Sequence, residues 1–216
     1  CPAWKVIKTG AGSELMKNPN QIADLIQQLD KALKIPITIK IRKGIDDTHV
    51  NAIKVAKIAE AAGAAAIAIH ARTQKQGYSG KSDWGLIKKV KEELKIPVIG
   101  NGDIFTPEDF KEKLEQSKVD YILIARGAIG NPYIFKQIED YMKTGKYKSK
   151  VKLVQFNEYL ALAKKHKIDF SQIKSQAINF TKGIRSGGKL RVELAKSKSM
   201  SDLTKEIDEF KKHHKR

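Results

Sequence analysis

The sequence predicts an α/β fold built on a parallel sheet, followed by a region made of helices alone. Four short, continuously apolar segments recur in the first two thirds of the chain: IPITIKI at 35–41, AAAIAIH at 64–70, IPVIGN at 96–101 and DYILIAR at 120–126. Strands buried on both faces have this composition. Helical patterns separate the segments at intervals of about thirty residues, which is the spacing of βαβ units.

Helices with recognisable start and stop signals are expected between these strands. The first follows Asn18, a residue that can cap a helix, and the second ends at Gly63, which can terminate one. Two further helices are expected to begin at Ser82 and Thr106, each before acidic residues. Pro107 suits the first turn of the latter helix.

After Tyr141 the chain loses its strand-forming segments and gains positive charge. Residues 141–216 hold 20 Lys and Arg against 7 Asp and Glu, whereas residues 1–140 hold 22 against 17. Amphipathic helical periods occupy three long segments and one short segment, at 152–166, 171–184, 199–214 and 189–196. We therefore expect a first domain over 1–145 and a basic helical domain over 146–216.

The composition excludes several classes of protein. The net charge of +18 indicates a polyanionic partner, or alternatively a lysine-rich surface without a specific ligand. A single cysteine excludes a disulfide framework and fits a reducing compartment. No apolar run is long enough to span a membrane, and no Cys/His cluster has the spacing of a metal site.

Polar side chains follow each of the four predicted strands. In strand order they are Lys40 and Arg42; His70, Arg72 and Thr73; Asn101, Gly102 and Asp103; and Arg126 and Gly127. The carboxyl ends of parallel strands share one rim where ligands bind, so these groups are expected to converge. Each has an ordinary structural explanation on its own, such as a tight turn at Asn-Gly. Their recurrence on four strands favours a binding site.

The segment ARGAIGNP predicts a phosphate site at the end of the fourth strand. Gly127 and Gly130 permit a close approach of the backbone, Arg126 supplies a charge, and a helix is expected to begin near Asn131. In eight-stranded barrels the phosphate lies after strands seven and eight. We therefore interpret the four strands as strands five to eight, the C-terminal half of a TIM (β/α)8 barrel, with an open, self-sufficient sheet as the alternative. Cys1 then follows strand four, inside a longer protein.

Five motifs in order resemble one family of flavin enzymes. The motifs CPAWKV…GAGS, ITIKIRKG, HARTQKQGYSG, PVIGNGDI and ARGAIGNP resemble the tRNA-dihydrouridine synthases, and QAINFTKGIRSGGKLR resembles the helical domain of archaeal-type members. The resemblance implies an FMN-dependent reduction of the C5=C6 bond of tRNA uridines to dihydrouridine, with NADPH or NADH as reductant. It also implies a cytoplasmic enzyme that needs no metal and is monomeric at full length.

The resemblance also implies roles for individual residues. Cys1 corresponds to the acid that protonates uracil C5, which suits a thiol whose ordinary pKa of about 8.5 keeps it protonated at neutral pH. Lys40 corresponds to a cation at the pyrimidine edge of the flavin, and Arg42 and Tyr78 to residues that hold the flipped-out uracil. The implied FMN shell comprises Lys40, His70, Asn101, Gly102, Asp103, Ala125 and, at the phosphate, Arg126.

The basic region supplies the expected RNA contacts, which are Lys182, Arg185, Lys189 and Arg191. They flank Gly187-Gly188, which we predict to be a flexible turn between two helices. Two alternatives stay open: another FMN barrel that acts on a free pyrimidine, and a non-catalytic fragment that only binds RNA. The family's first-strand FMN loop and the asparagine before its cysteine would precede residue 1, and ARG stands where GRG is common.

Overall fold

The computed structural model describes residues 1–213, and the chain divides into two compact units, Cys1–Ala125 and Arg126–Arg216. The predicted boundary at 145–146 falls inside the second unit, in the segment between two of its helices. It stays a prediction about where the functional domains meet. Each unit has its own hydrophobic core and is described separately below.

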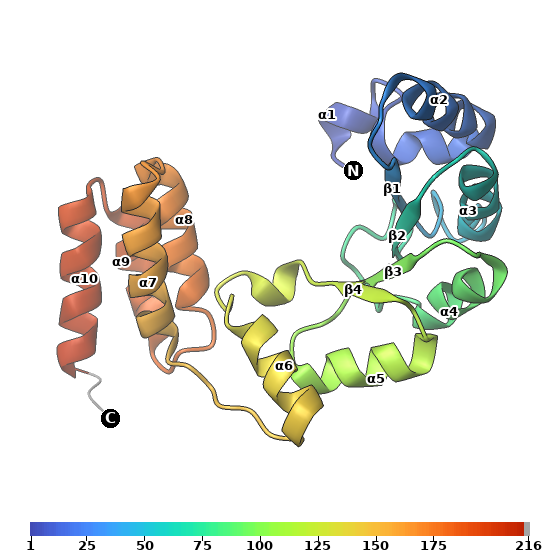
Figure 1. The fold of residues 1–216 in the computed structure, drawn as a ribbon. Coiled ribbons are helices and arrows are strands. Elements are labelled where there is room, and N and C mark those ends of the chain that lie inside the picture. Colours follow the sequence, from blue (N-terminus) through green and yellow to red (C-terminus); the bar gives the residue numbers. More distant parts are fainter. Residues whose placement is uncertain (214–216) are drawn as a thin grey trace. The chain divides into compact units, whose positions relative to one another are not determined.

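The first unit contains the predicted parallel sheet, with the strands in the order β1-β2-β3-β4 (Figure 1). The strands are β1 (Thr38–Arg42), β2 (Ala66–His70), β3 (Val98–Asn101) and β4 (Tyr121–Leu123). The α/β class and all four strands are confirmed. The fourth strand ends before its predicted limit at 126, because Leu123 pairs with Asn101, the last residue of β3, and no partner strand continues beyond it.

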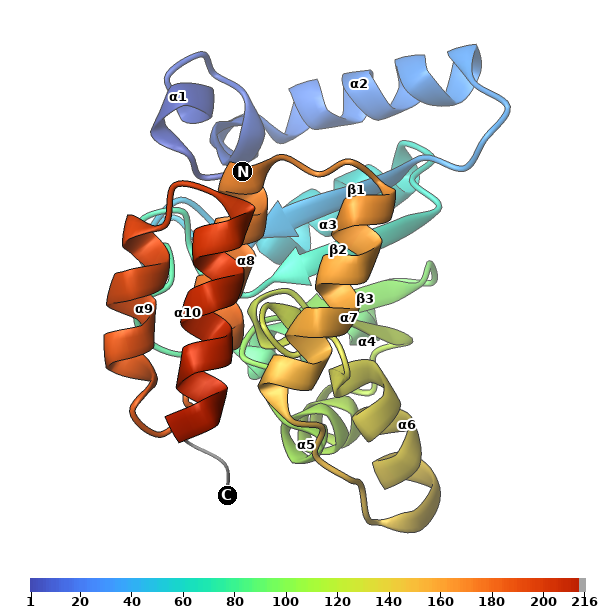
Figure 2. The same ribbon diagram turned by 90° about the vertical axis from the view of Figure 1, so that its left-hand side faces the viewer.

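Helices lie along one face of the sheet, one before β1 and one in each connection between strands (Figures 1 and 2). They are α2 (Pro19–Ala32), α3 (Ala52–Ala61), α4 (Trp84–Glu93) and α5 (Pro107–Ser117). Each packs against the next in chain order. Two short helices that the sequence did not predict precede them, α1 (Trp4–Ile7) and the 3-10 helix η1 (Gly12–Lys17).

Side-chain caps fix where these helices begin. Asn18 caps α2 as predicted, and Thr106 forms a reciprocal capping box with Asp109 at the start of α5. The predicted start of α4 at Ser82 is wrong by one residue, because the carboxylate of Asp83 caps this helix instead. The hydroxyl of Ser82 instead donates to the carbonyl oxygen of Asn101 at the end of β3.

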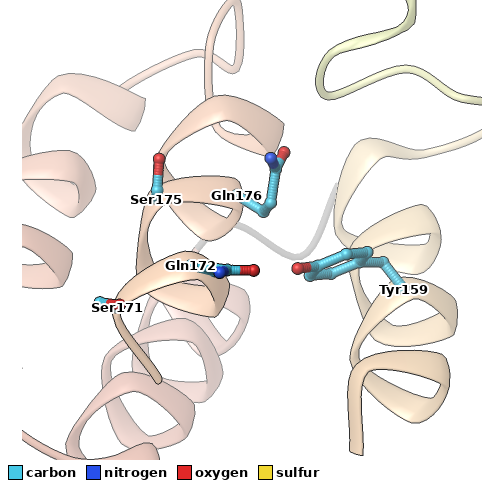
Figure 3. A pocket seen from close by; sticks show the side chains of 5 residues that line it. All are labelled: Tyr159, Ser171, Gln172, Ser175 and Gln176. Carbon is cyan, nitrogen blue, oxygen red and sulfur yellow. The ribbon is translucent and has the colours of Figure 1, made fainter. Parts of the chain in front are cut away.

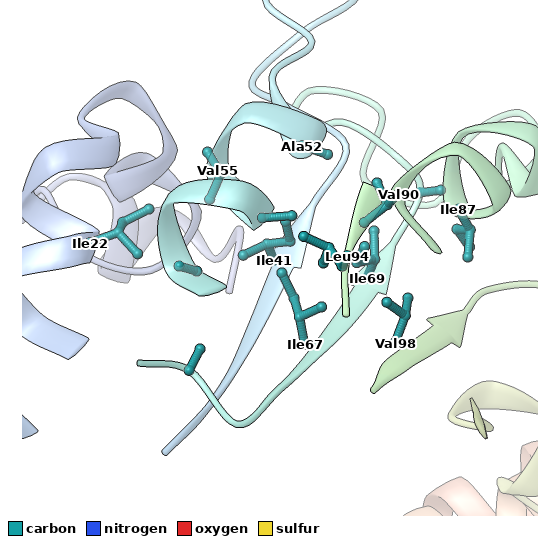
Figure 4. Close-up of a cluster of buried hydrophobic side chains, with 14 of the residues drawn as sticks. Ile22, Ile41, Ala52, Val55, Ile67, Ile69, Ile87, Val90, Leu94 and Val98 are labelled. Carbon is teal, nitrogen blue, oxygen red and sulfur yellow. The ribbon is translucent and has the colours of Figure 1, made fainter. Parts of the chain in front are cut away.

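The core of the first unit lies between the sheet and its helices (Figure 4). It is built from strand residues and from the facing sides of α3 and α4, including Ile41, Ile67, Ile69, Val98, Val55, Ile87 and Val90. Successive side chains of a strand point to opposite faces of a sheet. The alternate residues Lys40, Arg42, His70 and Asn101 therefore lie on the face that these helices do not cover.

The second unit is helical. It contains the 3-10 turn η2 (Arg126–Ala128), then α6 (Ile134–Thr144), α7 (Lys152–Lys165), α8 (Phe170–Phe180), α9 (Gly187–Lys196) and α10 (Met200–His213). The four helices predicted after residue 150 are present, and residue 214 of the last prediction lies outside the described residues. Helix α6 begins at Ile134, shortly after the predicted start near Asn131, and Asn131 itself is not helical because the residue before a proline avoids helical geometry.

The prediction of a flexible Gly187-Gly188 turn is wrong. These two glycines form the first turn of α9, and the turn between α8 and α9 occupies residues 181–186. A Cβ atom on Gly187 would lie 2.8 Å from the carbonyl oxygen of Thr181, so close packing explains the glycine there. The left-handed backbone that a turn needs is supplied by Ser186, with φ of 60°.

Candidate active site

Four polar side chains lie side by side on the face of the sheet opposite its helices. The strand register pairs Arg42 of β1 with His70 of β2, and His70 with Asn101 of β3. Lys40 lies two residues before Arg42 and points to the same face. The parallel register thus brings the predicted strand-end residues of three strands together at one edge.

The two cations on β1 lie in a partly desolvated environment. Arg42 is 7% exposed, and its Nη1 donates to the carbonyl oxygens of Thr73 at 2.8 Å and Gly77 at 3.1 Å. Desolvation lowers the pKa of Arg42. It is also the main cause of the lowered pKa of the more exposed Lys40, and the charge of Arg42 lowers that pKa further. Within residues 1–213 neither cation forms an ion pair with a carboxylate, so an anionic ligand would be stabilised beside them.

His70 is buried beside these cations. Desolvation first, and then the charges of Arg42, Lys40 and Arg72, lower its pKa to about 4, against an opposing effect of Asp103. The imidazole is therefore neutral at physiological pH and acts through its hydrogen bonds instead of a charge. The ring of Tyr78, a 64% exposed side chain, has its centroid 6.5 Å from that of His70.

The end of β3 is fixed by close packing. The Nδ2 of Asn101 donates to the carbonyl oxygen of Leu123 at 2.7 Å and joins the ends of β3 and β4. Gly102 adopts φ of 130°, and a Cβ atom there would lie 2.4 Å from the Oγ of Ser82. The indole Nε1 of Trp84 donates to the carbonyl oxygen of Gly102 at 3.0 Å. This turn accordingly requires glycine.

Asp103 pairs with Arg72, which the sequence placed among the polar groups at the strand ends but to which it gave no individual role. Its two carboxylate oxygens accept from Nη1 of Arg72 at 2.9 Å and from Nη2 at 2.7 Å, and it also accepts from the backbone N–H of Ser82. The only signal in the sequence was an arginine two residues after His70. A buried guanidinium needs a carboxylate, but the sequence does not say which one.

Cys1 is exposed, and hydrogen bonds to its carbonyl oxygen hold its backbone in place. That oxygen accepts from the backbone N–H of Ser13 at 3.0 Å and from its hydroxyl at 3.1 Å. Ser13 was not predicted as a site residue, although it belongs to the GAGS motif.

The remaining predicted residues lie at and beyond the end of the first unit. Ala125 is its last residue, and Arg126 opens η2 in the second unit. Of the predicted RNA contacts, Lys182, Arg185 and Lys189 are exposed. Arg191 is half-buried, and its Nη1 donates to the carbonyl oxygen of Thr181 at 2.9 Å, just past the end of α8.

Comparison with known proteins decides the family. The family model described as "Dihydrouridine synthase (Dus)" matches residues 1–215. The chain belongs to the dihydrouridine synthase family. It is 47% identical over 148 residues to the probable tRNA-dihydrouridine synthase of Rickettsia bellii, covering 68% of this chain and 45% of the relative. It is 43% identical over 145 residues to tRNA-dihydrouridine synthase B of Shewanella oneidensis, covering 67% and 45%.

The resemblance predicted from the motifs is thereby confirmed at the level of the family. The chain spans about half the length of the curated relatives it matches. Across residues 1–213 no helix is long and apolar enough to cross a membrane. The same residues contain no group of three or more His, Cys, Asp or Glu side chains arranged to hold a metal ion.

The second unit also contains a hollow of about 400 Å³ between α7 and α8 (Figure 3). Its lining is polar but uncharged, and consists of Tyr159, Ser171, Gln172, Ser175 and Gln176. Tyr159 packs against Phe156 and Phe180, and desolvation raises its pKa. No residue that the sequence predicted for the site lines this hollow.

Proposed function

We propose that the whole protein is an FMN-dependent enzyme that reduces the C5=C6 bond of uridines in tRNA to 5,6-dihydrouridine, with NADPH or NADH as reductant. Family membership and the names of the relatives support tRNA as substrate and dihydrouridine as product. The structural observation that carries the proposal is the joint placement of Lys40, Arg42 and His70 on one uncovered face of a parallel sheet.

We further propose that the four strands are strands five to eight of a (β/α)8 barrel, and that residues 146–216 form the tRNA-binding domain. The strands follow one another in the sheet without reversal, and α2 to α5 lie along one face only. A barrel has this arrangement because its helices form an outer ring, while the inner face of the sheet encloses packed side chains. A doubly wound sheet instead reverses its strand order and carries helices on both faces.

The chemistry of the uncovered face fits FMN. The cofactor carries an anionic phosphate, and its ring gains negative charge on reduction, whereas this face offers two cations without carboxylate partners and a neutral imidazole. The proposed shell is Lys40, His70, Asn101, Gly102, Asp103, Ala125 and, at the phosphate, Arg126. Because the Asp103 carboxylate is occupied by Arg72, its contribution is to shape the turn after β3.

Each side chain of the proposed site then has a defined task. FMN, when bound, supplies the hydride for C6 of the uracil. Cys1 holds the proton that C5 receives. The hydrogen bond from the Ser13 hydroxyl to the carbonyl oxygen of Cys1 fixes the backbone that carries the thiol. Lys40 stabilises negative charge at the ring edge. Arg42 orients the loop that carries Tyr78, and both side chains hold the uracil in its flipped-out position.

Single-turnover assays on the whole protein test this function. We expect bound FMN, reduction by NADPH, and dihydrouridine in tRNA. Cys1→Ala should leave flavin reduction nearly unchanged and slow dihydrouridine formation by about 10²–10⁴-fold, because only the proton donor is lost. Thr9→Ala, an exposed change in the same segment, should leave both rates unchanged.

The outcomes separate the parts of the proposal. If Cys1→Ala reduced uridine at the wild-type rate, the thiol would not be the proton donor. If free uridine were reduced as fast as uridine in tRNA, the result would favour an enzyme that acts on free pyrimidines. Binding of tRNA without any FMN would favour a protein that only binds RNA.

A further inference from the structure

Arg72 is the most enclosed charged side chain of the first unit, at 2% exposure. Its guanidinium donates to both oxygens of Asp103, at 2.9 and 2.7 Å. Nε donates to the carbonyl oxygen of Ser79 at 3.0 Å, Nη2 also reaches the carbonyl oxygen of Gly80, and Nη1 faces Nε2 of His70 at 3.4 Å. Five acceptors thus meet the five N–H donors, which offsets the cost of burying the charge.

The contact with His70 decides where the imidazole carries its proton. A guanidinium has donors and no acceptor, so the nitrogen that it faces must accept. Nε2 of His70 is that nitrogen, and in a neutral ring the proton then lies on Nδ1. His70 therefore offers an N–H donor from Nδ1, while Nε2 is held by Arg72.

The same side chain fixes the loop after β2. Arg72 holds the carbonyl groups of Ser79 and Gly80 at one end of the loop. Arg42 holds the carbonyl group of Thr73 at the start of the loop and that of Gly77, the residue before Tyr78. Tyr78 lies between Gly77 and Ser79, so its position depends on both arginines.

We propose that Arg72 is a positioning residue, which sets the tautomer of His70 and holds the loop that carries Tyr78. The placement rests on contacts within residues 1–125. Its consequence for catalysis rests on the proposed function. Arg72 itself would contact neither FMN nor uracil, because Asp103, His70 and two backbone carbonyls surround its guanidinium.

The tautomer can be measured without any activity. In the whole protein labelled with ¹⁵N-histidine, long-range ¹H–¹⁵N spectra should show His70 with its proton on Nδ1, and His70→Gln identifies the signal. Arg72→Met should shift the ring toward the Nε2–H form. If that variant does not fold, Arg72→Met combined with Asp103→Asn removes the donor without leaving the half-buried carboxylate of Asp103 without its guanidinium partner. Lys75→Ala, an exposed change in the same loop, should leave the tautomer unchanged.

A double-mutant cycle tests the consequence for catalysis. Arg72→Met should slow dihydrouridine formation by about tenfold or more, since small misplacements of reacting groups have effects of this size. In a His70→Gln background the same change should have a smaller effect, because Arg72 acts partly through that ring. Fully additive losses, or an Nε2–H tautomer in the unaltered protein, would overturn the proposal. A wild-type protein that forms no dihydrouridine would refute the proposed function, while the spectra would still decide the role of Arg72.

Discussion

At the scale of single residues, burial of a neutral His70 predicts how stability responds to pH. Its pKa is about 4 in the folded chain, against an ordinary value of 6.5. The unfolded chain therefore binds the proton more tightly, so the free energy of unfolding rises with pH between about 4 and 6.5 and is flat above. The full difference between these pKa values corresponds to about 3.4 kcal/mol, and solvent screening of the neighbouring cations reduces the expected contribution of His70 to roughly 2 kcal/mol. Urea unfolding of the whole protein and of His70→Gln measures it, and parallel pH curves for the two would contradict it.

The close approach of Gly12 to the backbone of Cys1 gives a second prediction for single residues. Gly12 has φ of 64°, and a Cβ atom there would lie 2.4 Å from the carbonyl oxygen of Cys1. Gly10 has φ of 78° but no atom within 4 Å of its Cβ position. Gly10→Ala should therefore cost only the strain of a left-handed alanine, about 1 kcal/mol. Gly12→Ala should cost more and also slow dihydrouridine formation, because it displaces Cys1.

Thermal unfolding and single-turnover assays of the two alanine variants distinguish these effects. Equal losses of stability and equal rates would mean that Gly12 is present only for its backbone conformation. A slower rate in Gly12→Ala alone would support the role of this glycine in placing residue 1.

The sequence could predict some site residues and not others. Lys40, Arg42 and His70 end apolar strands, and parallel register brings strand ends together, so their convergence follows from the pattern. The pairing of Asp103 with Arg72 depends on how two loops run in space. No local pattern encodes that path, so Arg72 was expected among the strand-end groups but its pairing with Asp103 was not.

At the scale of elements, the capping box of α5 predicts a measurable local stabilisation. Thr106 accepts from the backbone N–H of Asp109 at 3.1 Å, and Asp109 accepts from the backbone N–H of Thr106 at 3.0 Å. Thr106→Ala should lower the free energy of unfolding by about 1 kcal/mol, because the backbone N–H of Asp109 loses its acceptor. Gln116→Ala, an exposed change on the same helix, should have little effect in the same urea titration. Equal stabilities of these two variants would show that the box contributes nothing.

Element boundaries were predicted where local chemistry decides them. The caps at Asn18 and Thr106 are bonds within one turn, and both were foreseen. The short helices α1 and η1 have only 4 and 6 residues, too few to show a helical period. The glycine pair at 187–188 was misread as a turn because sequence does not distinguish a glycine required by packing from one required by φ.

At the scale of the whole molecule, positive charge is concentrated in one region. Residues 141–216 hold 20 of the 42 Lys and Arg residues but only 7 of the 24 Asp and Glu residues. Lys182, Arg185 and Lys189 are exposed, and no ion pair joins them to a carboxylate within the described part of the chain. Arg191 differs, because it bonds to the backbone carbonyl of Thr181. We therefore treat Arg191 as a structural residue and the other three as the candidate RNA contacts.

Removing these three charges should weaken binding of tRNA and reduce its dependence on salt. Each phosphate contact that a cation makes releases counterions, so losing one lowers the slope of log K against log salt by about one. The variant Lys182→Ala/Arg185→Ala/Lys189→Ala should therefore lower the slope by about 2–3. FMN content and thermal stability should change little, because these side chains are exposed.

A matched triple variant distinguishes a tRNA contact surface from a loss of net charge. Lys31, Lys34 and Lys54 are also exposed and have no ion-pair partner among residues 1–213, but they belong to the first unit. Changing these three to alanine removes the same charge, so a general electrostatic attraction would weaken equally in both variants. A slope that falls only in the Lys182, Arg185 and Lys189 variant supports direct contact with phosphates. Equal slopes in both variants would mean that this part of the second unit is an ordinary lysine-rich surface.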